Sequence, residues 1–199
     1  MGWRDGRGAG RRSYHHGNLR EALIAAALEL IAAKGPLGFT FAEAARSAGV
    51  SQAAPYRHFR DRDELMADVA KRGFERFEAR LEHAWGKGLP DPMTAFLRLG
   101  KAYLAFAREE PAYYAAMFEA GIPLETNPEL QQLGERAFAV LRAGSEAVCA
   151  RLPKESRPPA LMIALHIWSL SHGVASLFAR GDAARRKLPM SPEDLLEAG

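Results

Sequence analysis

The chain has a single cysteine, Cys149, among its 199 residues. One cysteine cannot form a disulfide within the chain, so an apolar core must hold the fold, as is usual in a reducing compartment. Cys149 lies in an apolar helical pattern, which favours a buried small hydrophobic residue over a redox sensor. Alternating β patterns bounded by turn signals are also lacking. The sequence therefore predicts an all-α protein.

Motifs for catalysis are missing as well. There is no HExxH, no GxSxG, no P-loop and no pair of carboxylates in an evident catalytic setting. His166 and His172 lie about 240° apart around a helix, so they cannot hold one metal ion on a single face. We therefore expect no enzymatic activity, no cofactor and no metal. Only a site assembled from distant segments stays open as an alternative.

Long hydrophobic runs are rare. The arginines near the N-terminus are not followed by an apolar stretch, so the sequence predicts a cytoplasmic protein without a signal peptide. Residues 160–179 have no Lys, Arg, Asp or Glu and are long enough to span a bilayer. His166, Ser169, Gly173 and Ser176, however, recur at helical spacing along one side. A helix buried between its own domain and a second copy needs such a stripe, whereas a lone membrane anchor does not, so we expect no membrane span.

The charge is unevenly distributed along the chain. Residues 1–60 contain nine basic and four acidic residues, and the remainder contains 18 basic and 20 acidic residues. A basic N-terminal part on a nearly neutral body is typical of a DNA-binding module. A merely basic tail is the alternative.

The segment TFAEAARSAGVSQAAPYRHF, residues 40–59, reads as two short helices joined by a tight turn. Thr40 and Glu43 have the spacing of a capping box at the start of the first helix. Gly49 stands where a sharp turn requires a positive φ. Ser51 is then expected to cap a second helix, Gln52 to His58, which would enter a DNA groove. An ordinary helical hairpin is the alternative.

The surrounding sequence resembles the DNA-binding domain of the tetracycline-repressor (TetR) family. The resemblance runs from Tyr14 to Leu65 and rests on four elements in order: the helix at 18–34, the break at 35–38, the AGVS turn at 48–51 and the YRHF-then-Asp run at 56–61. Further on, IWSLSHG at 167–173 is similar to the Trp–His–Gly signature of one TetR C-terminal domain type. The resemblance implies an N-terminal three-helix helix-turn-helix DNA-binding domain and a C-terminal helical domain for ligand binding and dimerisation.

We expect three segments: a flexible basic arm at 1–13, the helix-turn-helix domain at 14–60, and the helical ligand-binding and dimerisation domain at 61–199. In the DNA-binding domain, the Gln52 amide suits adenine in the major groove. The other expected DNA-contacting residues are Ser51 and Ala53 at base edges, Pro55 as a stiffener of the reading helix, Thr40, Tyr56, Arg57 and His58 at phosphates, and Arg11 and Arg12 in a neighbouring groove.

The C-terminal part is rich in aromatic and weakly polar side chains that suit a small-molecule pocket. The expected ligand-binding residues are Phe96, Tyr103, Phe106, Tyr113, Met117, Phe118, Met162, His166, Trp168 and His172. Plain helix core is the alternative for each aromatic residue, and the resemblance favours a pocket for the set. Because few basic residues lie on these faces, a small hydrophobic or aromatic effector fits better than a polyanion.

The resulting hypothesis is a ligand-responsive transcriptional regulator, with repression implied by the resemblance alone. It would bind palindromic double-stranded operator DNA as a homodimer, pair through the helices near residues 130–152 and 160–180, and leave the DNA when the effector binds. The alternative is a helical ligand-binding or enzymatic protein whose basic N-terminal part serves another purpose.

Overall fold

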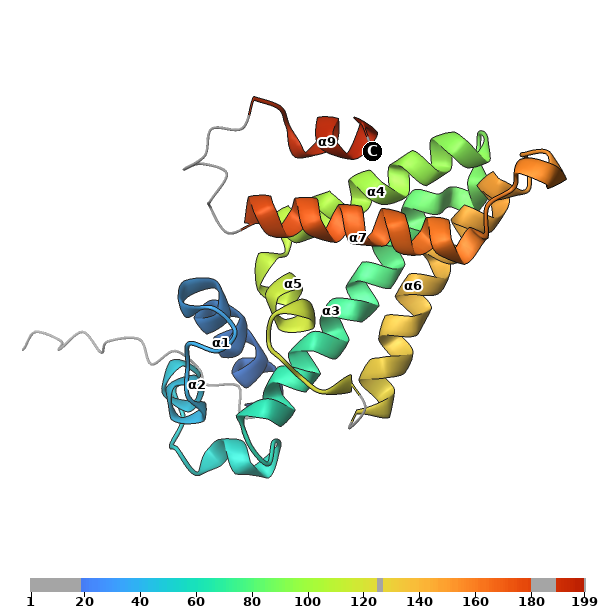
Figure 1. Ribbon diagram of the computed structural model, residues 1–199. Coiled ribbons are helices and arrows are strands. Elements are labelled where there is room, and N and C mark those ends of the chain that lie inside the picture. Colours follow the sequence, from blue (N-terminus) through green and yellow to red (C-terminus); the bar gives the residue numbers. More distant parts are fainter. Residues whose placement is uncertain (1–18, 125–126, 180–188, 199) are drawn as a thin grey trace, which may run out of the picture.

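The structure is a computed structural model that describes residues 19–124, 127–179 and 189–198. Within these ranges the chain forms eight α-helices joined by turns and short 3₁₀ segments, without any strand (Figure 1). The all-α fold class predicted from the sequence is therefore confirmed. The expected basic arm at 1–13 lies outside the described residues.

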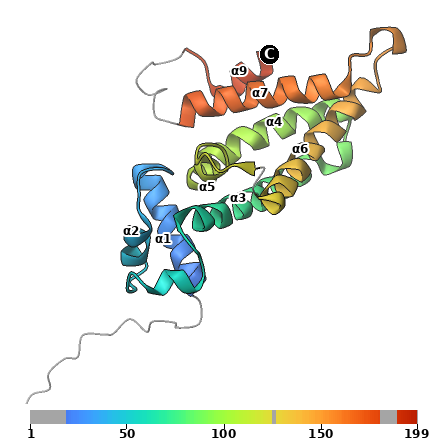
Figure 2. The same ribbon diagram turned by 60° about the horizontal axis from the view of Figure 1, so that its bottom comes forward.

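The N-terminal helices form a head at one end of the molecule (Figures 1 and 2). It contains α1 (Leu19–Lys34), α2 (Phe41–Ser47) and a short 3₁₀ helix (Ala54–Arg57). Helix α1 packs against both α2 and α3. Its buried face follows the helical spacing of Leu23, Ala27 and Ile31, which places them in the apolar core.

Helix α3 (Arg62–Trp85) runs from the head into the body (Figure 1). It begins at Asp61, whose carboxylate accepts a hydrogen bond from the amide of Glu64, and it ends at Gly86 in the left-handed region with φ 51°. Helix α4 (Pro92–Glu109) begins in the same way, because Asp91 accepts from the amides of Met93 and Thr94. In both helices the Asp carboxylate satisfies amides of the first turn, and α4 also has a proline at its first position.

The rest of the body surrounds α3 and α4. Helix α5 (Pro111–Phe118) packs against α1 and α3, and α6 (Pro128–Cys149) lies along α3. Helix α7 (Ala160–Ala179) crosses α4 and α6, and α9 (Pro192–Ala198) covers α4 and α7. Cys149 is buried at the end of α6, in line with the prediction of a small core residue.

The apolar stripe of α6 packs inside the protomer. Leu130, Leu133, Ala137 and Leu141 are all buried in the core. The sequence assigns part of this stripe to a contact with a second copy, but the structure uses it to hold α6 on α3 and α4.

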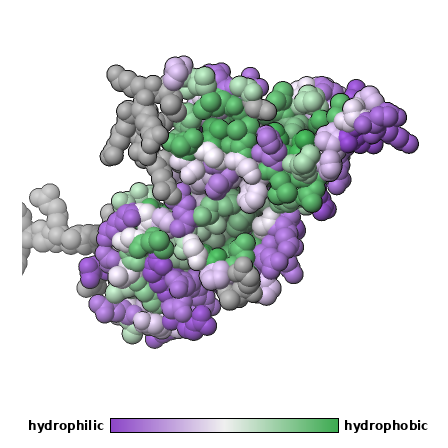
Figure 3. Space-filling model, in the orientation of Figure 1, coloured by the Kyte–Doolittle hydropathy of each residue, from purple (hydrophilic) through white to green (hydrophobic). Residues whose placement is uncertain are grey.

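Among the described residues, α7 has a length and composition that would let it cross a membrane. It packs instead on α4, α6 and α9, yet only 22% of its apolar stretch, Ala160–Phe178, is buried within the protomer. Figure 3 shows the hydrophobic surface concentrated on the upper body, where α7 lies in front. Within the part of the chain that the structure describes, one side of α7 is therefore left uncovered.

Candidate DNA-binding face and effector cavity

The first helix of the helix-turn-helix is capped as predicted. The Thr40 hydroxyl accepts a hydrogen bond from the amide of Glu43, and the Glu43 carboxylate accepts one from the amide of Thr40 at 2.8 Å. A hydrogen bond from Lys34, at 2.6 Å, and those from Thr40 lower the pKa of Glu43 to about 2. The capping box thus also ties α2 to the end of α1.

The turn after α2 depends on Gly49, which has φ 72°. A side chain at this angle would crowd the backbone, so glycine is the residue that fits at least cost. The sequence prediction for Gly49 is confirmed.

The second helix differs from the prediction. The sequence predicts an α-helix from Gln52 to His58 capped by Ser51, whereas the structure has a turn followed by the 3₁₀ helix Ala54–Arg57 without a side-chain cap. Pro55 explains the difference, because it has no N–H for the Ser51 carbonyl and its ring would clash with that carbonyl in an α-helix. The amide of Ala54 bonds the Ser51 carbonyl instead, at 3.0 Å. That helix prediction was wrong.

The shorter element still presents most of the expected DNA-contacting side chains to solvent. The exposed residues are Thr40, Ser51, Gln52, Ala53, Tyr56, Arg57 and His58. The Tyr56 ring packs edge-on against Phe41, with ring centroids 5.1 Å apart, while 64% of Tyr56 stays exposed. The contact holds Tyr56 on α2, so its position does not depend on a long helix.

Three of the predicted DNA-binding residues stand apart from that exposed set. Pro55 is buried, so it shapes the element from within and offers no surface to DNA. Arg11 and Arg12 lie outside the described residues. The DNA contacts themselves stay a prediction for every residue of the set.

Helix α3 is bonded to the head at several points. The Arg62 guanidinium donates to the carbonyl oxygens of Pro36 and Phe39, the latter at 2.9 Å, and lies over the Phe39 ring. Further along, Arg72 pairs with Glu21 on α1. The hydrogen bond from Arg72 lowers the pKa of Glu21. These contacts tie α3 to α1 and to the segment that follows α1.

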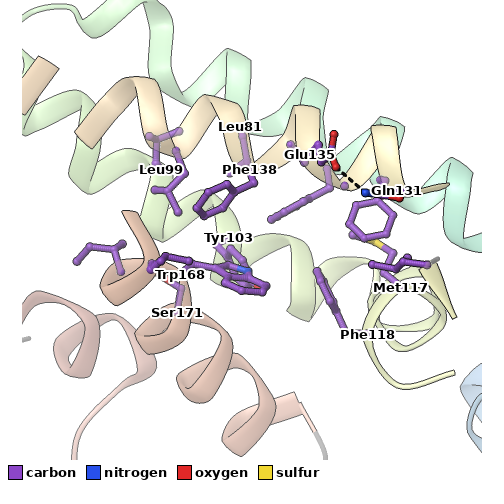
Figure 4. A pocket seen from close by; sticks show the side chains of 18 of the residues that line it. Leu81, Leu99, Tyr103, Met117, Phe118, Gln131, Glu135, Phe138, Trp168 and Ser171 are labelled. Atoms are coloured by element: carbon purple, nitrogen blue, oxygen red, sulfur yellow. Dashed lines mark hydrogen bonds between the residues drawn. The ribbon is translucent and has the colours of Figure 1, made fainter. Parts of the chain in front are cut away.

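A cavity of about 640 Å³ lies in the body between α3, α4, α5, α6 and α7. In Figure 3 it appears as a hydrophobic hollow below α7, and Figure 4 shows its walls from close by. Its size falls in the range of small-molecule sites, and its lining is mostly apolar.

Four of the predicted ligand-binding residues line this cavity. They are Tyr103 from α4, Met117 and Phe118 from α5, and Trp168 from α7 (Figure 4). The structure brings Trp168 of α7 together with residues of the consecutive helices α4 and α5.

The other predicted ligand-binding residues lie elsewhere. Phe96 and Phe106 are buried in the helix core, and Tyr113 is buried beneath the Arg76 guanidinium, 4.8 Å from its ring. Met162 and His166 are exposed on the outer side of α7. None of these five is part of the cavity lining.

The cavity also contains residues that sequence reasoning missed. Phe74 and Phe77 come from α3, and Gln131, Glu135 and Phe138 come from α6. Their helical spacing was visible, since 74 and 77 are three apart and 131, 135 and 138 are four and three apart. That spacing identifies a helix face but does not say whether the face meets a cavity or another helix.

His172 lies just behind the cavity wall and joins two tyrosines. Its Nδ1 atom is 3.0 Å from the Tyr103 hydroxyl and 2.9 Å from the Tyr114 hydroxyl. Nδ1 offers one lone pair or one N–H, so it bonds one of the two hydroxyls at a time, as acceptor or as donor according to the tautomer. Burial lowers the pKa of His172, and the charge of Glu119 opposes that effect. Burial also raises the pKa of Tyr103.

The lowered pKa of His172 predicts a loss of stability on mild acidification. Below about pH 6.5 the unfolded chain takes up a proton that the folded state resists, so the free energy of unfolding falls as the pH falls. We expect the melting temperature to drop between pH 7.5 and pH 5.5, and the drop to shrink in His172→Gln. His166→Gln, which changes an exposed histidine on the same helix, should keep the full drop. Equal pH dependence in the two variants would contradict the role of His172.

The geometry defines a helical regulator with a DNA-binding head and a cavity in its body, and comparison with known proteins gives the same class. Residues 23–69 match the model for bacterial regulatory proteins of the tetR family, and residues 96–199 match that for the tetracyclin repressor-like C-terminal domain. The chain therefore belongs to the TetR family of transcriptional regulators, which are not enzymes. The domain boundary between residues 60 and 61 and the Trp–His–Gly subtype stay predictions.

Solved structures show the same fold. A protein of unknown function from Rhodococcus sp. RHA1 is 29% identical, with a TM-score of 0.76 over 94% of both chains. The TetR family transcriptional regulator PfmR from Thermus thermophilus is 21% identical, with a TM-score of 0.69 over 88% of this chain and 93% of its own. The fatty acid degradation regulator FadR from Bacillus halodurans is 13% identical, with a TM-score of 0.69 over 92% of each. A search among curated proteins finds no match.

Proposed function

We propose that this regulator binds a palindromic operator in the cytoplasm as a homodimer, and that a small hydrophobic effector releases it. The exposed Gln52, Tyr56 and Arg57 support the DNA contact, since an amide suits base edges while a hydroxyl and a guanidinium suit phosphates. Two heads must lie about 34–36 Å apart to enter successive major grooves. If the protein is a repressor, its release from the operator by the effector would turn a gene on.

The uncovered side of α7 supports the dimer. Met162, Leu165, Ser169, Gly173 and Leu177 follow helical spacing along it, and all are exposed within the protomer. The large apolar members are 43% to 56% exposed. A continuous apolar stripe of this kind is typical of a surface that a second copy covers.

A contact between α3 and α5 supports the proposed link between effector binding and the head. Met117 forms part of the cavity wall and lies against Gly73 of α3, where an added Cβ would come within 2.7 Å of the Met117 sulfur. Helix α5 also packs on α1. An effector that displaces Met117 or Phe118 would therefore push on α1 and α3 together, and so tilt the head.

A mobility-shift assay with DNA flanking the protein's own gene tests this function. We expect saturable binding that resists competition by random DNA. A hydrophobic effector should lower operator affinity and raise the melting temperature together, because a ligand that favours the non-binding state does both. No preference for flanking DNA over random DNA would contradict operator binding. A ligand that binds without changing operator affinity would contradict the switch.

A further inference from the structure

The cavity is mostly apolar, and the charged side chain among its described lining residues is acidic. Among the described residues that line it there is no Lys, Arg or His, and Glu135 is the one acidic residue of that set. Glu135 lies on α6 at the solvent-exposed edge of the cavity and accepts a hydrogen bond from the Gln131 amide at 2.9 Å (Figure 4). An amide donor leaves the negative charge in place, so the cavity presents a carboxylate without a cation.

The nearby basic residues of α3 and α6 do not add a positive charge to the cavity lining. Arg136, next to Glu135, points to α3 and donates to both oxygens of Glu78 at 3.0 and 3.1 Å. Arg80 on α3 donates to Glu109 of α4 through Nη2, its Nη1 is buried without a hydrogen-bond partner, and Arg80 is not one of the residues that line the cavity. A carboxylate or phosphate on an effector would therefore enter an apolar space without a positive partner, which costs free energy.

The aromatic walls of the cavity favour a positively charged ligand. Six aromatic side chains from five helices line it: Phe74, Phe77, Tyr103, Phe118, Phe138 and Trp168. Several meet edge to face, including Phe74 with Phe118 at 5.6 Å and Phe138 with Trp168 at 5.9 Å between ring centroids. Such rings attract a cation through their negative faces, and indole does so best.

The polar groups deep in the cavity wall, Tyr103 and His172, are hydrogen-bonded to each other. They therefore do little to favour binding of an anion. The Tyr103 hydroxyl is bonded to His172, and what Tyr103 offers to the cavity is mainly its ring. Burial keeps His172 neutral near pH 7, so it supplies no positive charge.

We infer that the effector is a hydrophobic organic cation, whose apolar body fills the aromatic cavity and whose positive group lies near Glu135. The inference rests on the proposed function, because it names the class of molecule that the sensing cavity takes. It follows from the charge of the lining and from the aromatic walls together, since an apolar cavity alone would accept neutral molecules equally well.

Calorimetric titration of the full chain with three ten-carbon probes tests the inference. Decyltrimethylammonium, decanol and decanoate share one alkyl chain and differ in charge, and each is used below its micelle concentration. We expect the cation to bind tightest and decanoate weakest, with about a tenfold difference or more between them. Decanoate binding as tightly as the cation would overturn the inference.

Two variants test which cavity residues cause the preference for the cation. Glu135→Gln should weaken binding of the cation about two- to fivefold and leave decanol unchanged, as expected for a partly exposed charge pair. Glu146→Gln is the matched control, because it removes the same charge from the exposed side of α6 outside the cavity lining. Trp168→Leu should weaken the cation more than decanol. Equal losses for both probes in both cavity variants would also overturn the inference.

The same probes separate this inference from the proposed function. Selective binding of the cation without release from the operator would uphold the ligand class and contradict the switch. Release from the operator by decanol or decanoate, with weaker binding of the cation, would uphold the switch and contradict the ligand class.

Discussion

The Gly173→Leu variant is expected to be a folded monomer that loses operator binding. Among the described residues, an added Cβ at Gly173 meets no atom within 4 Å beyond its chain neighbours and its own helix backbone, so the larger side chain is expected to fit the isolated chain. Leucine also has a higher helix propensity than glycine, by about 0.8 kcal/mol, so the helix itself should not weaken. In a dimer paired through α7, however, the same side chain would overpack the contact between copies.

The expected loss is large because each copy contributes one half of the DNA contact. A monomer engages a single half-site and forfeits the gain from linking two, which is typically about 100-fold or more. Sedimentation should give a dimer for the wild type at micromolar concentration and a monomer for Gly173→Leu, and circular dichroism should give equal helix content. Gly173→Ala adds only a methyl group and is expected to keep the dimer. A dimeric Gly173→Leu protein with wild-type operator affinity would sink the proposed pairing.

The second large effect is expected at the DNA-binding turn. Replacing Gln52 by Ala should cost about 1–3 kcal/mol for each half-site on the true operator and little on random DNA, because a base-reading amide is lost. Replacing Arg57 by Ala should weaken binding to all sequences. The slope of log K against log salt should then become less steep by about one unit for each half-site, since one phosphate contact is lost.

A matched control separates the Arg57 effect from a change in net charge. Lys154 is exposed in the turn between α6 and α7, at the end of the body away from the head (Figure 1). Lys154→Ala removes the same charge and should leave both the affinity and the salt slope almost unchanged. Wild-type binding by both Gln52→Ala and Arg57→Ala would show that the head uses another surface.

The 3₁₀ turn has a consequence for how this head reads DNA. A longer helix could offer side chains along its length, whereas the turn at 51–58 presents its exposed side chains, Gln52, Tyr56 and Arg57 among them, within a few residues of one another. The Phe41–Tyr56 contact and the buried Pro55 hold this short element in place. Base recognition through Gln52 is therefore proposed to depend on a rigid turn.

The sequence by itself determined the features that arise from local chemistry. The caps at Thr40, Asp61 and Asp91, the turn at Gly49 and the helix starts at proline all depend on hydrogen bonds and backbone angles within a few residues. For the same reason the head and its family were recognisable from residues 14–65. Pro55 also carried the local signal for a shortened second helix, and the prediction underestimated its effect.

Only the tertiary structure decided which helix faces meet one another and which meet a cavity. Phe118 and Tyr113 lie on the same short helix, yet one lines the cavity and the other packs beneath Arg76. Leu130 and Leu133 look like an interface stripe but are buried in the core of the protomer, whereas Met162 and Leu177 are left exposed. Helical spacing specifies that a face is apolar, but what covers that face depends on neighbours brought from distant parts of the chain.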